Sequence, residues 1–147
     1  MVKGISTISF LLRAKVHIKG FSFTRYEKAW MELCAACADS VYGDSFRLKG
    51  DRVEEIGNNV SLEFKDMNFG EKGAESLTIC GRAVKGSNTI HVRFFDGEKE
   101  SKQIVEFDQC SDYEQKTFAL TPITGRVTVT FVFMPGSCFD FKSFRFT

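Results

Sequence analysis

Apolar and polar residues alternate along most of this chain with a period of two, the spacing of β-strands that bury one face. The alternating segments are short and are separated by Gly, Asn and Asp, which favour turns. From residue 41 onward this pattern predicts nine strands, at 45–49, 53–56, 60–64, 77–82, 89–95, 103–107, 116–120, 126–133 and 139–146. Strands of this number and spacing predict an all-β fold, a jelly-roll-like β-sandwich of two sheets.

The last predicted strand changes its apolar parity along its length. Phe139 and Phe141 fit one alternation, whereas Phe144 and Phe146 fit the opposite one. A β-bulge, or burial of both strand faces, explains such a shift, and we favour the bulge. Both prolines, at positions 122 and 135, fall just outside predicted strands, where the missing N–H donor costs nothing.

Two different patterns precede the sandwich. Clean alternation over 7–19 predicts one more strand with a buried face. Thr24 and Glu27 have the spacing of a helix-capping box, and apolar residues recur at helical intervals from Tyr26 onward. These features predict a short α-helix over 25–38.

Composition and charge narrow the classes of partner. The 147 residues are 43% hydrophobic and include 16 Phe, which is enough for one domain with a packed core. Lys and Arg number 20 against 19 Asp and Glu, so the chain lacks the basic excess that nucleic-acid binding requires. No apolar run is long enough to cross a bilayer, and the N-terminus lacks the pattern of a secretory signal. We therefore expect no nucleic-acid partner, no membrane anchor and no export.

Five cysteines are scattered through apolar segments. Cys34 and Cys37 have the CxxC spacing found in zinc and redox sites. However, two further zinc ligands at suitable spacing are missing, and no βαβ pattern surrounds the pair. We interpret all five as reduced, buried and inert thiols, which predicts a cytoplasmic protein.

The sequence shows no recognisable arrangement of catalytic residues. His17 and His91 alternate with apolar neighbours and have no nucleophile motif beside them, and the acidic residues fall mostly in turns or on solvent faces. The loops between predicted strands hold Asn58, Asn59 and Tyr113, side chains suited to polar ligand recognition. Carboxylates in the same loops suit calcium equally well, and composition does not decide between the two.

Several stretches resemble the C-terminal region of bacterial family 2 β-galactosidases. They are Tyr42-Gly43-Asp44-Ser45-Phe46, Gly50-Asp51, Ile56-Gly57-Asn58-Asn59-Val60-Ser61-Leu62, Asp66-Met67-Asn68-Phe69-Gly70 and the segment from Phe131 to Phe141. The resemblance covers about residues 22–147 and implies a fragment of three parts. Residues 1–23 would be a strand of an upstream immunoglobulin-like domain, 24–40 a helical connector, and 41–147 a carbohydrate-binding-module-like sandwich of the galactose-binding-domain type.

The resemblance implies a non-catalytic accessory domain of a β-galactosidase-type glycoside hydrolase, with catalysis in a separate domain of the parent enzyme. Two functions follow from it. The domain either binds carbohydrate, a galactoside or a plant oligosaccharide, through its inter-strand loops, or serves interdomain packing and oligomerisation with a vestigial sugar cleft. The isolated chain is expected to have no hydrolase activity in either case.

More distantly, the chain is similar to family 6 carbohydrate-binding modules, and this similarity implies the site residues. Tyr113 matches one of two aromatic side chains that stack on sugar rings, Ile56 lies near the other, and Cys138 replaces an asparagine that binds hydroxyls. Asn58 and Asn59 can supply hydrogen bonds from the neighbouring loop. Stacking suits sugars because the axial C–H face of a pyranose is apolar.

The same similarity implies a structural calcium ion. Asp44 and Asp140 match the acidic positions in the first and last strands that hold calcium in many such modules. Calcium takes about six to eight oxygen ligands and can link two strands. The alternative is that both carboxylates accept hydrogen bonds from backbone groups at strand ends.

Overall fold

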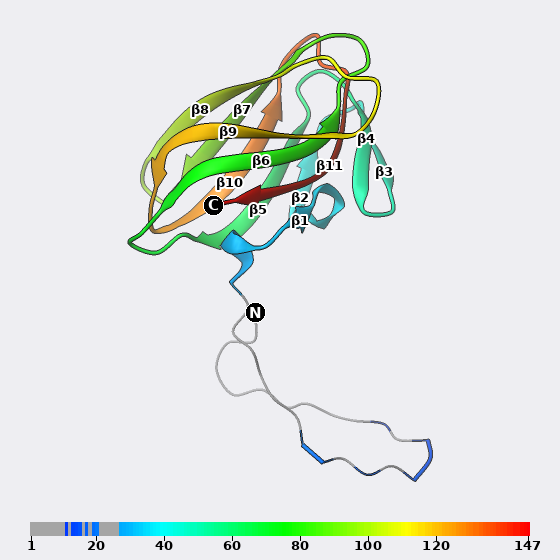
Figure 1. The fold of residues 1–147 in the computed structure, drawn as a ribbon, viewed down its shortest axis with the longest axis vertical. Coiled ribbons are helices and arrows are strands. Elements are labelled where there is room, and N and C mark those ends of the chain that lie inside the picture. The colour runs from blue at the N-terminus through cyan, green and yellow to red at the C-terminus, as the bar shows by residue number, and fades with distance from the viewer. Residues whose placement is uncertain (1–10, 12, 16, 18, 21–26) are drawn as a thin grey trace.

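A computed structural model of the protein describes residues 11, 13–15, 17, 19–20 and 27–147 (Figure 1). From residue 27 onward the chain contains two short 3-10 helices, η1 (Lys28–Trp30) and η2 (Ala35–Cys37), and a series of strands. The strands are β1 (Leu33–Cys34), β2 (Ser40–Tyr42), β3 (Arg47–Lys49), β4 (Arg52–Ile56), β5 (Ser61–Asn68), β6 (Ala74–Arg82), β7 (Asn88–Phe95), β8 (Glu100–Phe107), β9 (Glu114–Ile123), β10 (Arg126–Phe133) and β11 (Phe139–Phe146). No helix in this described part is long and apolar enough to cross a membrane.

The strands form two antiparallel sheets packed face to face. The first sheet has the order β3-β4-β11-β6-β9, with β1 also paired to β11, and the second has the order β2-β5-β10-β7-β8. All nine predicted strands are present, with longer ends than predicted for several of them. The prediction of an all-β, jelly-roll-like sandwich is therefore confirmed.

Phenylalanine rings fill the space between the sheets. Phe64 of β5 and Phe131 of β10 each lie 4.7 Å, ring centroid to ring centroid, from Phe144 of β11 in the opposite sheet. These contacts are edge-on or tilted, the arrangement that adds about 0.5–1.5 kcal/mol per pair to the effect of burial. Strand alternation thus brings aromatic residues from distant segments into one core.

The parity shift in β11 is a bulge, as predicted. The pairing of β11 with β6 shifts register between Phe141 and Ser143, and the phenylalanines on both sides of the shift are at most 1% exposed. One extra residue therefore returns the strand to the same buried face.

The placement of Pro122 outside a strand is wrong, because Pro122 lies within β9. This strand is at the edge of its sheet, and its register with β6 shifts between Ala74 and Ser76. An edge strand with a shifted register tolerates a residue without an N–H donor. Pro135 follows β10, outside the strands, as predicted.

The α-helix predicted over 25–38 is wrong within the described residues. Residues 28–38, called the strap below, instead consist of η1, β1 and η2. Leu33 and Cys34 pair with Phe144 and Ser143 of β11, so pairing with a strand edge overrides the helical spacing of the apolar residues. The strand predicted over 7–19 lies mostly outside the described residues, and those described within it are not in a strand.

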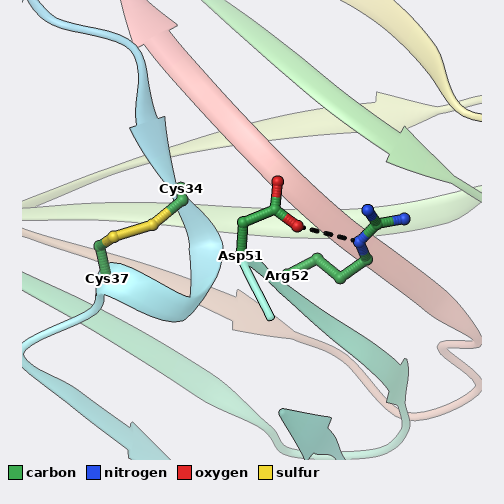
Figure 2. The surroundings of a disulfide bond; sticks show 4 residues. All are labelled: Cys34, Cys37, Asp51 and Arg52. Carbon is green, nitrogen blue, oxygen red and sulfur yellow. Dashed lines mark hydrogen bonds and ion pairs between the residues drawn. A yellow bond between two sulfur atoms is a disulfide. The ribbon is translucent and has the colours of Figure 1, made fainter. Parts of the chain in front are cut away.

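Cys34 and Cys37 form a disulfide, so the prediction of five reduced cysteines is wrong for this pair (Figure 2). The tight turn of η2 brings their Cα atoms to 5.3 Å, within the range that a disulfide spans. Cys80 and Cys110 are free and buried, and Cys138 is free and partly exposed. The disulfide removes the argument for a cytoplasmic location that rested on reduced thiols.

Candidate functional site

Five loops meet at one end of the sandwich, at the upper right of Figure 1, and we call this the loop end. The loops are residues 43–46, 57–60, 83–87, 108–113 and 134–138. Each of them carries the chain from one sheet to the other, and the antiparallel pairing within both sheets brings these crossings to the same end of the sandwich.

Hydrogen bonds join these loops to one another. The Asn58 Oδ1 atom accepts a bond from the Gly136 N–H at 2.6 Å, and the Asn88 Oδ1 atom accepts one from the Cys138 N–H at 2.8 Å. Gln109 Nε2 donates to the Val84 carbonyl at 2.9 Å. Side-chain amides thus satisfy loop backbone groups that would otherwise need water, which holds the rim of the loop end in place.

Tyr113 lies at the loop end, immediately before β9, and does not belong to the core. Its hydroxyl is 3.3 Å from Glu54 Oε1, and the guanidinium carbons of Arg52 and Arg82 are each 5.2 Å from its ring centroid. Burial, together with the negative charges of Asp140 and Glu54, raises the pKa of this phenol. Arginine over an aromatic face is favourable by about 0.5–2 kcal/mol.

Carboxylates next to Tyr113 are neutralised by basic side chains. Glu54 is 6% exposed, and its Oε2 atom lies 3.2 Å from Lys49 Nζ. Asp140 is 8% exposed and accepts bonds from Arg82 Nε at 2.8 Å and Arg82 Nη2 at 2.5 Å. These bonds raise the pKa of Arg82. The surroundings of Tyr113 are therefore charged but paired.

The other residues predicted for sugar contact have different environments. Asn58 is bound to the Gly136 backbone, and Asn59 is an exposed turn residue with φ of 57° whose N–H donates to the Phe133 carbonyl. Cys138 is a free, partly exposed cysteine in loop 134–138, the loop whose Gly136 N–H donates to Asn58. Ile56 has no exposed surface, because it packs into the core opposite Phe139 of β11, so the structure removes it from the set of possible ligand contacts.

Asp44 and Asp140, the carboxylates of the calcium site that the similarity implies, have different surroundings. Both Asp140 oxygens are engaged, Oδ2 by Arg82 and Oδ1 by the Glu55 N–H at 2.8 Å. Asp44 is an exposed residue between β2 and β3. The described residues include no group of three or more His, Cys, Asp or Glu side chains able to hold a metal ion. This donor set does not fit calcium, because a guanidinium already supplies the positive charge beside Asp140.

Sequence reasoning missed Arg52, Glu54 and Arg82 as parts of this site. A signal was present in β4, where the buried Val53 and Ile56 are three residues apart and so break the two-residue alternation. Glu55 occupies the extra position with φ of 56°, and the register of β4 with β11 shifts there. Alternation from the buried Val53 places Glu54 on the outer side of the sheet, where Tyr113 reaches it, and the bulge returns Ile56 to the buried face.

A hollow lies at the opposite end of the sandwich. Its volume is about 190 Å³, and Phe95, Asp96, Arg126 and Thr128 contribute to its lining. None of the residues predicted for sugar or calcium binding lines it. The loop end therefore remains the candidate site.

Solved structures with the same fold include carbohydrate-binding modules. A family 6 module from Clostridium stercorarium, in complex with cellobiose, matches with a TM-score of 0.71 and 21% identity over 81% of this chain and 94% of that one. A family 6 module from Clostridium cellulolyticum, in complex with xylose, matches with a TM-score of 0.69 and 17% identity over 81% and 98%. At these identities the likeness establishes the fold alone.

A larger enzyme also contains this fold. A glycoside hydrolase family 43 arabinoxylan arabinofuranohydrolase from Bacillus subtilis, in complex with cellotetraose, matches with a TM-score of 0.64 and 19% identity. The match covers 81% of this chain but 27% of the enzyme. No protein-family model and no curated protein sequence matches the chain.

Proposed function

We propose that this protein is a non-catalytic carbohydrate-binding domain whose ligand site is at the loop end. The observation that carries the proposal is the position of Tyr113, an aromatic residue outside the core in the loop before β9. The fold supports the proposal, because solved modules of this fold are in complex with cellobiose or xylose. The ligand class in this proposal is a plant oligosaccharide or a galactoside.

The chemistry around Tyr113 suits a polar ligand with an apolar face. In this proposal a sugar ring competes with the Arg52 and Arg82 guanidinium groups for the Tyr113 ring, and the exposed Asn59 of loop 57–60 carries N–H donors for hydroxyl groups. Because Ile56 is buried, a second stacking ring is missing from the position that the similarity implies. We therefore expect weaker affinity than that of a site with two stacking rings.

The test is a calorimetric or NMR titration of the full chain with xylo-, cello- and galacto-oligosaccharides. Tyr113→Ala should abolish saturable binding, whereas Tyr113→Phe keeps the ring and should retain it. Tyr42→Ala is the matched control, because Tyr42 is a tyrosine of β2 that is 58% exposed on the other sheet.

The outcomes of the titration distinguish carbohydrate binding at the loop end from binding elsewhere and from no binding. No binding at millimolar ligand would contradict carbohydrate binding altogether. Loss of binding in Tyr42→Ala with retention in Tyr113→Ala would place the site on the second sheet and contradict the loop end. Circular dichroism of each variant separates a loss of binding from a loss of fold.

A structural role is the second candidate, and the contacts of Tyr113 favour it. Its ring already lies beside two guanidinium groups and its hydroxyl beside Glu54, so the side chain is engaged without a ligand. In this role the domain packs against the catalytic domain of its parent enzyme or supports oligomer contacts. Absence of binding in the titration, combined with strong destabilisation by Tyr113→Ala, would support this role.

We further propose that the parent enzyme is a β-galactosidase-type glycoside hydrolase of family 2. The resemblance of the segments at 42–46, 56–62 and 131–141 supports this, and the Bacillus subtilis enzyme illustrates the same fold within a longer hydrolase. The isolated chain should not hydrolyse a chromogenic β-galactoside. Turnover by pure protein that scales with its concentration would contradict the assignment of catalysis to another domain.

A further inference from the structure

The Cys34–Cys37 disulfide lies at the surface, in contrast to two of the three free cysteines (Figure 2). Cys37 is exposed and Cys34 is half-buried, whereas Cys80 and Cys110 are buried. One end of the disulfide therefore belongs to a residue at the surface of the folded sandwich. Solvent access is the first requirement for thiol–disulfide exchange.

The disulfide joins two parts of the strap that contact different strands. Cys34 belongs to β1 and pairs with Ser143 of β11, while the Ala36 N–H of η2 donates to the Asp51 carbonyl, 3.4 Å away in the turn before β4. Figure 2 shows the disulfide beside this turn. The disulfide therefore fixes the short segment that connects the β11 contact to the β4 contact.

The strap completes one edge of β11. On that edge β4 pairs with Phe139 and Phe141, and β1 pairs with Ser143 and Phe144 farther along. The Ser143 hydroxyl also donates to Glu32 Oε1 at 2.6 Å. Since β1 has only two residues, its pairing depends on the constraints that hold the segment around it.

The nearby carboxylate does not oppose exchange. Asp51 lies beside the disulfide in Figure 2, and a hydrogen bond and ion pair with Arg52 Nε at 3.1 Å lower its pKa. An unpaired negative charge would disfavour the thiolate that leaves during reduction, and the pairing with Arg52 offsets that effect.

We propose that the Cys34–Cys37 disulfide is a thiol–disulfide exchange site whose reduction by a low-molecular-weight thiol or dithiol frees β1 from the edge of β11. An external thiolate attacks the sulfur of the exposed Cys37, the disulfide bond breaks, and Cys34 leaves as a thiolate that takes up a proton. A second external thiol then attacks the mixed disulfide, which releases Cys37 as a thiol and oxidises the reductant to its disulfide. Two electrons pass to the protein in this exchange.

The first experiment counts thiols in the full chain, without any saccharide. Protein purified without reductant and then denatured should react with iodoacetamide at three cysteines, which are Cys80, Cys110 and Cys138. After native incubation with dithiothreitol, mass spectrometry should find Cys34 and Cys37 alkylated while Cys80 and Cys110 stay protected. Five reactive thiols before reduction would overturn the proposal, as would labelling of Cys34 and Cys37 only under denaturing conditions.

The second experiment tests the structural consequence. In the reduced protein, amide hydrogen exchange should lose protection at β1 and at the one amide of residues 143–144 that faces β1, while the amides of β5, β7 and β10 keep theirs. Cys34→Ser/Cys37→Ser should reproduce this pattern without reductant, and Cys138→Ser is the matched control that should not. Unchanged protection in reduced wild-type protein would overturn the release of β1, whether or not the double variant folds.

Discussion

Asp140 and Arg82 lie directly opposite each other in the pairing of β11 with β6, and Arg82 Nε and Nη2 both donate to Asp140 Oδ2. The other Asp140 oxygen accepts the Glu55 N–H, so this carboxylate links β11 to both neighbouring strands. A guanidinium thus provides the positive charge that the similarity to family 6 modules assigns to calcium. The first two predictions test this relationship.

Removing either partner should destabilise the fold. Because Asp140 is largely buried and the Arg82 side chain is 35% exposed, we expect Arg82→Gln or Asp140→Asn to lower the free energy of unfolding by about 1–3 kcal/mol. Denaturant unfolding measures the change. Arg126→Gln is the control, because its ion pair with Asp66 is exposed and exposed pairs contribute about 0–1 kcal/mol. Equal losses of stability in Arg82→Gln and Arg126→Gln would show that the Arg82–Asp140 pair stabilises the fold no more than an exposed ion pair does.

Calcium should have no effect on thermal stability. The guanidinium of Arg82 already satisfies Asp140, and Asp44 is exposed, so the two carboxylates do not form a site for the ion. Differential scanning calorimetry should give the same Tm with millimolar calcium and with a chelator. A rise in Tm on adding calcium that disappears in Asp140→Asn would contradict this prediction.

Stability should fall at alkaline pH through Tyr113. Burial, with the charges of Asp140 and Glu54, raises the pKa of Tyr113 above its ordinary value of 10.0, so the folded state holds this proton more tightly than the unfolded state. The resulting stabilisation is complete below pH 10 and is lost as the pH rises through the folded-state pKa. Unfolding curves recorded at increasing pH should show a steeper decline for wild type than for Tyr113→Phe. Identical slopes would exclude a contribution from this phenol.

A methyl group at position 81 should not fit. A Cβ atom on Gly81 would lie 2.7 Å from Phe139 Cε1 and 3.0 Å from the Asp140 carbonyl oxygen, and closer still to the tip of the Phe139 ring. Gly81→Ala should therefore lower the free energy of unfolding by about 1–3 kcal/mol. Phe139→Leu shortens the ring side chain and should partly relieve the clash, so the double variant should be more stable than the sum of the single effects predicts. Strict additivity would show that the ring is not the obstacle.

The alternation of residue types by itself determined the sandwich and much of its detail. A two-residue alternation indicates which face of a strand is buried. The nine predicted strands and the bulge between Phe141 and Ser143 therefore follow from local spacing. The strap shows the limit of such reasoning. Its apolar residues have helical spacing, but pairing with β11 places Leu33 in the core as part of a strand.

Only the tertiary structure decided the composition of the loop end and the state of the cysteines. Arg82 bonds to Asp140 over a separation of 58 residues, and Tyr113 meets Glu54 over 59. Such partners depend on sheet order and register, which local spacing does not encode. The Cys34–Cys37 pairing likewise required η2 to bring the two Cα atoms to 5.3 Å, because a CxxC spacing in sequence is compatible with both free thiols and a disulfide.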